Sequence, residues 1–184
     1  MNLIDFNKEF SGFEHNEDIL IDTNILFALL NEFDTWHITV QNLFNNYIFN
    51  EDSNVALYIH SGMINEVMYL SLSTLKDYIA KYPNETINED IISNTKKAVQ
   101  QGARDFIDFD FLNLLTCNKP SVLRQIDYSD YFGSMDSLVV SLAEEYGISL
   151  LTVDSRLKNN IVNRINEFSN INNIYYTPPR NKSY

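Results

Sequence analysis

Apolar positions along the chain fall into short continuous runs and into longer repeats at helical spacing. Four segments have the length and composition of buried strands: residues 19–22, 55–61, 148–154 and 173–177. The first three are followed by apolar residues at helical spacing, at 24–32, 63–82 and 155–168. This alternation predicts an α/β fold in which helices pack on a central, mostly parallel sheet.

The length of 184 residues and the hydrophobic content of 45% suit one domain with a sizeable core. We expect three additions to this domain: an N-terminal arm at 1–17, an extra helical segment near 83–127 and a loose tail at 178–184. A long helix is predicted over 91–116. The aromatic run at 105–115 would then be a core-facing part of that helix, or alternatively a surface for a partner or substrate.

Charge and cysteine content narrow the possible functions. The chain has 13 Lys and Arg against 25 Asp and Glu, a net charge of −12, which argues against tight, unaided binding to a polyanion. It does not exclude a site where divalent cations supply the positive charge. Cys117 is the single cysteine, which excludes a disulfide framework and a cysteine metal cluster. Without a leader or a membrane-length apolar run, we expect a cytoplasmic protein with no membrane partner.

Four carboxylates are predicted to meet at the edge of the sheet where ligands of such folds bind. Asp22 and Asp154 end strands, Glu66 is placed in the first turn of the helix after 55–61, and Asp136 starts the helix that runs to Gly147. Each acid alone could cap a helix or complement its dipole. Carboxylates crowded together, however, repel one another unless a cation lies between them, and hard oxygen ligands select Mg²⁺ or Mn²⁺.

Three segments carry a resemblance to a known family: ILIDTNILFALL, SGMINEVMYL and SMDSLVVSLAEEYGISLLTVDSRL. Together they resemble the PIN-domain family, and within it the VapC-like toxin ribonucleases. The motif residues of the family are matched, in order, by Asp22 and Asn24, by Glu66, by Asp136, and by Thr152 with Asp154. The matched segments span roughly residues 18–158.

The resemblance implies a PIN-like three-layer α/β/α fold and a metal-dependent endoribonuclease that hydrolyses RNA phosphodiester bonds. The catalytic and metal-holding residues would be Asp22, Glu66, Asp136 and Asp154. Asn24 and Thr152 would orient the carboxylates or a water. One Mg²⁺ or Mn²⁺ would activate water and another would neutralise the leaving 3′ oxygen, giving 5′-phosphate and 3′-hydroxyl ends. The family also implies a toxin–antitoxin role, with an antitoxin protein that blocks the cleft, and a homodimer.

Other polar residues near the predicted site receive smaller roles. Basic residues are few there: Arg156 and Lys158 after Asp154, with Lys119 and Arg124 in the preceding loop. RNA held by so few contacts should bind weakly and with a shallow salt dependence. Three further residues are given structural roles: Asp127 and Asp130 in turns, and His60 as a hydrogen-bonded surface histidine.

Two other functions compete with the nuclease. One is a PIN-like scaffold or binding module without catalysis, although a degenerate member should have lost at least one of the four acids. The other is a phosphohydrolase that uses a strand-end Asp as its nucleophile. That chemistry usually needs a second Asp two residues later, where Asn24 stands, and a well-placed Lys, for which the sequence offers no candidate.

Overall fold

The structure is a computed structural model that describes residues 1–50, 53–72, 75, 80 and 89–183. Within these residues, six parallel strands form a sheet in the order β1-β6-β5-β2-β3-β4. The strands are β1 (Asn2–Asp5), β2 (Asp18–Ile21), β3 (Ala56–His60), β4 (Leu112–Leu115), β5 (Ser149–Thr152) and β6 (Asn173–Tyr176). The helices are α1 (Thr23–Leu30), α2 (His37–Tyr47), α3 (Ser61–Leu70), α5 (Glu89–Asp108), α6 (Lys119–Phe132), α7 (Ser134–Tyr146) and α8 (Ser155–Val162), with the short 3-10 helices η1 (Ile165–Glu167) and η2 (Pro179–Asn181).

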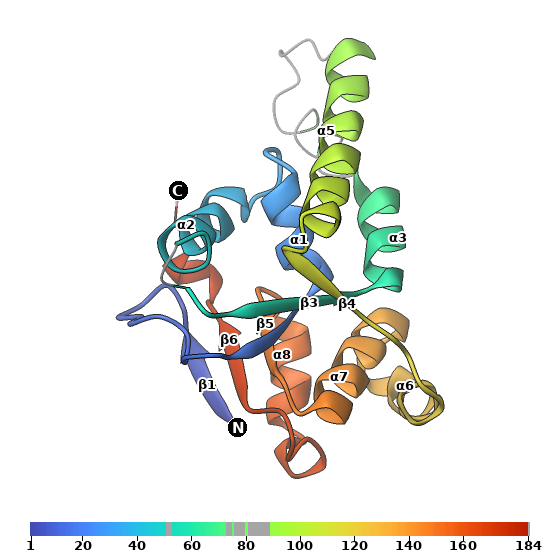
Figure 1. The fold of residues 1–184 in the computed structure, drawn as a ribbon. Helices are drawn as coiled ribbons and strands as arrows, with labels where there is room; N and C mark the ends of the chain where they lie inside the picture. Colours follow the sequence, from blue (N-terminus) through green and yellow to red (C-terminus); the bar gives the residue numbers. More distant parts are fainter. Residues whose placement is uncertain (51–52, 73–74, 76–79, 81–88, 184) are drawn as a thin grey trace.

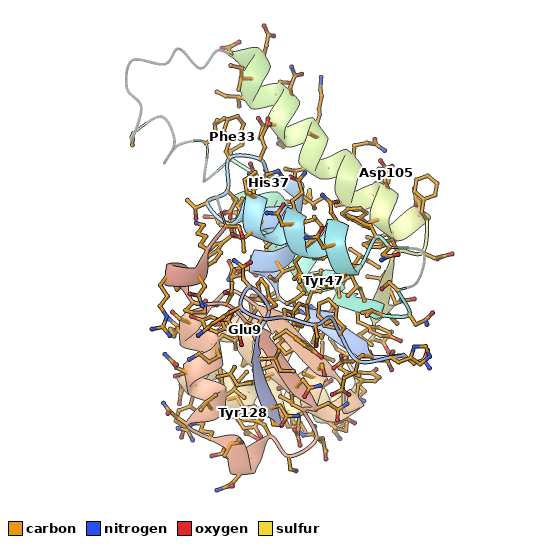
Figure 2. The ribbon with its side chains drawn as sticks, turned by 90° about the vertical axis from the view of Figure 1, so that its left-hand side faces the viewer. Glu9, Phe33, His37, Tyr47, Asp105 and Tyr128 are labelled. Atoms are coloured by element: carbon orange, nitrogen blue, oxygen red, sulfur yellow. The ribbon has the colours of Figure 1, made fainter. Side chains whose placement is uncertain are left out.

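Helices cover both faces of the sheet, which confirms the predicted three-layer α/β/α architecture (Figure 1). The first layer contains α1, α2, α3 and α5 and packs on the face where Ile19 and Ile21 of β2 are buried. The second layer contains α6, α7 and α8 and packs on the face of Leu20. Figure 2 shows Tyr47 in the first layer and Tyr128 in the second. Because neighbouring strand residues point to opposite faces, a sheet covered on both faces requires the continuous apolar runs seen in the sequence.

The order of the strands reverses between β2 and β5. From β2 the chain proceeds through β3 to β4 on one side, whereas β5 and β6 lie on the other side. In open parallel sheets, ligands bind at such a reversal, beyond the carboxyl ends of the strands. Asp22 directly follows β2 and Thr152 ends β5, so both residues lie at this point.

The predicted helix over 91–116 is wrong in its second half. α5 ends at Asp108, Asp110 has a φ of 55°, and Leu112–Leu115 forms the edge strand β4 beside β3. A positive φ at a residue other than glycine ends a helix locally. The aromatic run is therefore divided: Phe106 and Phe111 pack on the core, whereas 80% of the Phe109 side chain is exposed.

The loop predicted before Asp136 contains a helix that the sequence reading missed. Asn118 and Ser121 form a capping box at the start of α6, and a proline lies in its first turn, where helices tolerate it. Gly133, with a φ of 88°, separates α6 from α7. None of the helices within the described ranges is long and apolar enough to cross a membrane.

Both ends of the chain are more ordered than predicted. The arm at 1–17 contains β1, which pairs with β6 over its whole length. The tail predicted to be loose packs on α2, where Ser183 N donates a hydrogen bond to Thr39 Oγ1 at 2.9 Å. The helix predicted over 63–82 corresponds to α3, and its part beyond residue 72 lies mostly outside the described residues, as does most of the predicted break at 83–90.

Candidate active site

A row of polar side chains crosses the sheet at the carboxyl ends of its central strands. The strand register, continued two residues beyond Leu20, places Asp22 between Thr152 of β5 and His60 of β3. Asp22 N donates to Leu151 O at 2.9 Å, which continues the hydrogen-bond ladder. Because Asp22 and His60 both have extended backbones, their side chains face the same helical layer as Leu20, that of α6, α7 and α8.

Asp22 is the most buried of the four predicted acids, with 2% of its surface exposed. It occupies the N-cap position of α1, yet its side chain makes no capping hydrogen bond. Oδ2 instead accepts hydrogen bonds from Thr152 Oγ1 at 2.7 Å and from Asn24 Nδ2 at 3.3 Å. Burial raises the pKa of Asp22 to about 7; the charges of Asp136 and Asp154 also raise it, and the two hydrogen bonds lower it. Helix capping therefore does not explain Asp22.

Asp154, by contrast, does cap a helix. Its Oδ1 accepts hydrogen bonds from the backbone N–H groups of Arg156 at 2.6 Å and Leu157 at 3.1 Å, at the start of α8. Thr152 links this cap to the buried acid, because Thr152 Oγ1 accepts from Asp154 N at 2.9 Å while it donates to Asp22. The Asp154 carboxylate is thus oriented by the same network that holds Asp22.

Glu66 reaches the edge from the other helical layer. It lies in the second turn of α3, not the first, because α3 begins at Ser61 after the N-cap His60. Thr23, which is 4% exposed, donates a hydrogen bond from Oγ1 to Glu66 Oε2 at 2.7 Å. Sequence reasoning missed Thr23, because only the fold brings the start of α1 beside α3.

Asp136 lies in the first turn of α7, as predicted. Burial raises its pKa to about 6; the charges of Asp154 and Glu66 also raise it, and Arg156 lowers it. Asp22 responds in turn to the charges of Asp136 and Asp154. The fold therefore brings all four predicted carboxylates into one field of mutual repulsion.

The donor chemistry of this cluster suits a hard cation. One oxygen is held by protein donors in each of three acids: Oδ2 of Asp22, Oε2 of Glu66 and Oδ1 of Asp154. Within the described ranges, no three His, Cys, Asp or Glu side chains converge into a ready-made metal site. Mg²⁺ in proteins is usually held by one or two carboxylates and several waters, and the carboxylate oxygens of this cluster are of the type that it takes.

The prediction that His60 is a hydrogen-bonded surface histidine is wrong. Its side chain is fully buried, and neither ring nitrogen has a hydrogen-bond partner among the described residues. Burial lowers its pKa to about 4, so the ring is neutral at pH 7. A Cβ added to Gly62 would lie 3.0 Å from the His60 ring and 3.1 Å from Met135 Cε, which shows how tightly α3 and α7 enclose the ring. Its place at the end of an apolar strand was the signal for burial.

Of the predicted basic residues, Arg156 lies nearest the acids. It lowers the pKa of Asp136, which burial raises, and its Nη2 donates to Phe132 O at 2.7 Å. Lys158 follows one helical turn from the Asp154 cap, and its Nζ lies 5.0 Å from the ring centre of Tyr176.

The remaining polar residues predicted near the site belong to α6: Lys119, Arg124, Asp127 and Asp130. Arg124 pairs with Glu145 at 2.7 Å, near the end of α7 opposite to Asp136. Asp127 and Asp130 are exposed helix residues and do not form a turn. None of these four is needed to describe the acid cluster.

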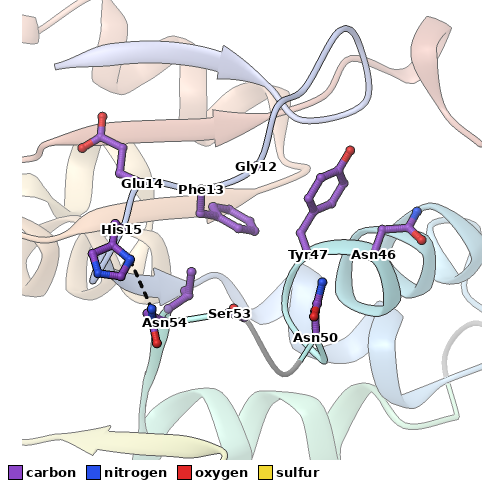
Figure 3. A pocket seen from close by; sticks show the side chains of 10 residues that line it. Gly12, Phe13, Glu14, His15, Asn46, Tyr47, Asn50, Ser53 and Asn54 are labelled. Carbon is purple, nitrogen blue, oxygen red and sulfur yellow. Dashed lines mark hydrogen bonds between the residues drawn. The ribbon is translucent and has the colours of Figure 1, made fainter.

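A separate hollow of about 210 Å³ lies at the opposite, amino edge of the sheet (Figure 3). It is lined by residues 12–15, 46–47, 50 and 53–55. His15 and Asn54 are hydrogen bonded across it at 3.1 Å between Nδ1 and Nδ2. The hollow and the acid cluster are therefore separated by the length of the strands.

No family model matches the chain, and no curated protein matches it.

Proposed function

We propose that this chain is a Mg²⁺- or Mn²⁺-dependent endoribonuclease of the PIN-like type, which hydrolyses RNA phosphodiester bonds. The observation that carries the proposal is Asp22, buried at the reversal of the strand order with its pKa raised to about 7. A buried carboxyl with a strongly raised pKa beside other acids is typical of functional sites. Binding of a cation would relieve this repulsion.

The four acids would hold the cation, and their neighbours would keep them oriented. Thr152 and Asn24 hold Asp22, and Thr23 holds Glu66. A bound Mg²⁺ or Mn²⁺ would supply activation of water and charge neutralisation on the leaving oxygen. Water would attack phosphorus, the bond from phosphorus to the 3′ oxygen would break, and the products would carry 5′-phosphate and 3′-hydroxyl ends.

Two partner proteins belong to this proposal. As the toxin of a toxin–antitoxin pair, the nuclease would be blocked by an antitoxin that places a basic side chain among the acids, where it would relieve the same repulsion as a cation. A homodimer is the second expectation. Sedimentation of the purified chain alone tests the homodimer. Sedimentation of the chain co-expressed with a candidate antitoxin tests the complex.

A catalytically silent scaffold is the second candidate. It is favoured by the absence of a ready-made group of three metal-binding side chains within the described ranges. Under this alternative the acids would still sit at the sheet edge, but purified protein would bind Mn²⁺ weakly and cut no RNA.

The test is cleavage of a mixed RNA pool by purified protein, with Mg²⁺ or Mn²⁺ and with EDTA. Asp136→Asn removes one acid of the cluster, and Asp130→Asn, an exposed residue of the neighbouring α6, is the matched control. We expect cutting that requires the metal, disappears in Asp136→Asn and persists in Asp130→Asn.

Cleavage that survives in EDTA would overturn the metal dependence, and equal cleavage by both variants would overturn the site. If no RNA is cut, calorimetry with Mn²⁺ distinguishes the two candidates. Tight binding that Asp136→Asn weakens would favour a nuclease with a narrow substrate range, and weak binding would favour the scaffold.

A further inference from the structure

The basic residues of this acidic chain are concentrated near its C-terminal end. Residues 155–184 contain five Lys or Arg and one Glu, a net charge of +4, whereas residues 1–154 contain eight against twenty-four, a net charge of −16. This asymmetry matters because the segment begins immediately after the metal-site candidate Asp154. A phosphate-bearing ligand would find more cations than acids in this segment of the chain.

Two of these cations lie around Tyr176, at the carboxyl end of β6. Tyr176 pairs in register with Thr152, the residue that holds Asp22. Lys158 Nζ lies 5.0 Å above the Tyr176 ring, a cation–π contact. Burial raises the pKa of Tyr176, as do the charges of Asp154 and Asp5, and the charge of Arg180 lowers it.

A third cation lies over the single tryptophan of the chain. Lys182 Nζ is 4.5 Å from the centre of the half-buried Trp36 ring, which precedes α2. The segment that carries Arg180 and Lys182 is held in place: Asn181 Nδ2 donates to Asp5 Oδ2 at 2.6 Å, and Thr39 Oγ1 donates to Ser183 O at 3.0 Å. Figures 1 and 2 both show η2 between α2 and α8.

Acids lie beside these cations as well: burial raises the pKa of Asp34, and the charge of Lys182 lowers it. Asp5 accepts hydrogen bonds from Asn181 and from Asn7 N, and Asp34 accepts one from Trp36 N at 2.7 Å. Arg180 is exposed, and Lys158 and Lys182 are half-buried. We name these three cations with Trp36 the basic strip.

We propose that the basic strip is the path by which single-stranded RNA reaches the acid cluster, with Lys158, Arg180 and Lys182 on the phosphates and Trp36 beside a base. This inference rests on the proposed nuclease function. Cations spaced along a surface together with an aromatic ring are the usual means of binding single strands without sequence preference. Such a strip would also let a chain of net charge −12 bind RNA, because it places three cations near the acid cluster, which would otherwise repel the substrate.

The test measures binding separately from cleavage. Short fluorescein-labelled oligouridine is titrated with protein that carries Asp136→Asn in the presence of Mg²⁺, so that the RNA stays intact. Arg180→Gln with Lys182→Gln removes two cations of the strip. Lys96→Gln with Lys97→Gln, on the exposed surface of α5, removes two cations elsewhere and is the matched control.

We expect the strip variant to bind more weakly and to lower the slope of log affinity against log salt by about 1.4, since each lost phosphate contact of a single strand lowers it by about 0.7. The control variant should bind like its parent. Emission from Trp36 should change when RNA binds, and this change should vanish in the strip variant. Circular dichroism confirms that both variants are folded.

Equal weakening in the strip and control variants would overturn the path, because it would show an effect of net charge alone. Unchanged Trp36 emission, or no binding by the parent protein, would also overturn it. Tighter binding of duplex than of single-stranded oligonucleotide would refute the proposed preference of the strip for single strands. RNA binding that needs the strip, in a protein that cuts no RNA, would leave the path standing and refute the nuclease. If Arg180→Gln with Lys182→Gln, made without Asp136→Asn, cuts RNA with the same KM as the wild-type protein, the nuclease would stand and the path would be refuted.

Discussion

Two buried carboxylates stand at opposite edges of the sheet, and their surroundings differ in kind. Glu17 precedes β2 and is 7% exposed, and Asp22 follows β2 and is 2% exposed. Glu17 accepts four hydrogen bonds, from Glu14 N, Ser149 Oγ, Asn173 Nδ2 and Tyr175 OH. Asp22 accepts two, both on Oδ2, and the charges of Asp136 and Asp154 add to the effect of burial in raising its pKa.

Glu17 has the surroundings of a structural carboxylate, and Asp22 is the carboxylate proposed to be functional. A buried carboxylate supplied with enough donors stabilises the fold, because each donor replaces a lost water. A buried carboxylate with few donors and acidic neighbours reduces stability until something from outside compensates it. One strand serves both groups: β5 begins with Ser149, which donates to Glu17, and ends with Thr152, which donates to Asp22.

The largest effect is expected when the structural carboxylate is removed. Glu17→Ala should lower the free energy of unfolding by about 3–5 kcal/mol, because three buried side-chain donors and the backbone N–H of Glu14 lose their acceptor at once. Urea unfolding at neutral pH measures this, and Glu32→Ala, at an exposed position after α1, is the control. A loss below about 1 kcal/mol, the typical net value of a single hydrogen bond, would show that the hydrogen bonds to Glu17 do not stabilise this edge of the sheet.

Asp22→Asn should instead raise the free energy of unfolding of the metal-free protein. The pKa of Asp22 is raised from 3.8 to about 7, so the folded state binds the proton more tightly and is penalised as the pH rises through 7. At about pH 8 the variant should gain about 2–4 kcal/mol in free energy of unfolding, and the gain should vanish near pH 4. Thermal unfolding across this range measures it; a destabilised variant at about pH 8 would mean that Asp22 is structural.

On acidification, protonation of His60 should lower the free energy of unfolding, whereas protonation of Asp22 should raise it. Its folded pKa, about 4, lies below the ordinary value of 6.5, so the unfolded state binds the proton more tightly and stability falls as the pH drops from 6.5 to 4. The loss should reach about 3 kcal/mol. In wild-type protein it is partly hidden by the gain from protonated Asp22. Asp22→Asn should expose it, and Asp22→Asn with His60→Leu should remove it, both followed by urea unfolding against pH.

The smallest expected effects compare the two hydroxyls of β5. Ser149→Ala and Thr152→Val should each cost about 1–2 kcal/mol near pH 8, because each removes a hydrogen bond to a buried carboxylate. The loss from Thr152→Val should shrink below pH 6, where Asp22 is protonated in the folded state. Equal pH dependence in the two variants would contradict the distinction between the two edges.

Sequence reasoning located the parts of the fold that depend on local pattern. The runs that became β2, β3, β5 and β6 are continuous apolar segments, and the rule that parallel strands end at one edge placed Asp22, Asp136 and Asp154 together. It missed what depends on distant partners. β1 exists because Asn2 meets Asn173, and Leu112–Leu115 becomes a strand because β3 lies beside it.

The candidate site shows the same division. The acids were recognisable from their positions at strand ends and helix starts. Thr23 and Glu17 were not, because their hydrogen-bond partners are 43 and 132 residues away in the sequence. His60 carried a signal for burial at the end of an apolar strand, but its enclosure between α3 and α7 depends on the fold. The basic strip was also hidden, since Trp36 and Lys182 meet only after β6 and α2 are both in place.

The position of β5 and β6 late in the chain has a consequence during protein synthesis. Thr152 orients Asp22 and Asp154, and among the described strands β1 pairs with β6 alone. Of these strands, β5 and β6 are made last. A chain under synthesis therefore lacks an assembled site until residues 149–176 have emerged from the ribosome, and for a protein proposed to cut RNA this order of assembly would delay activity.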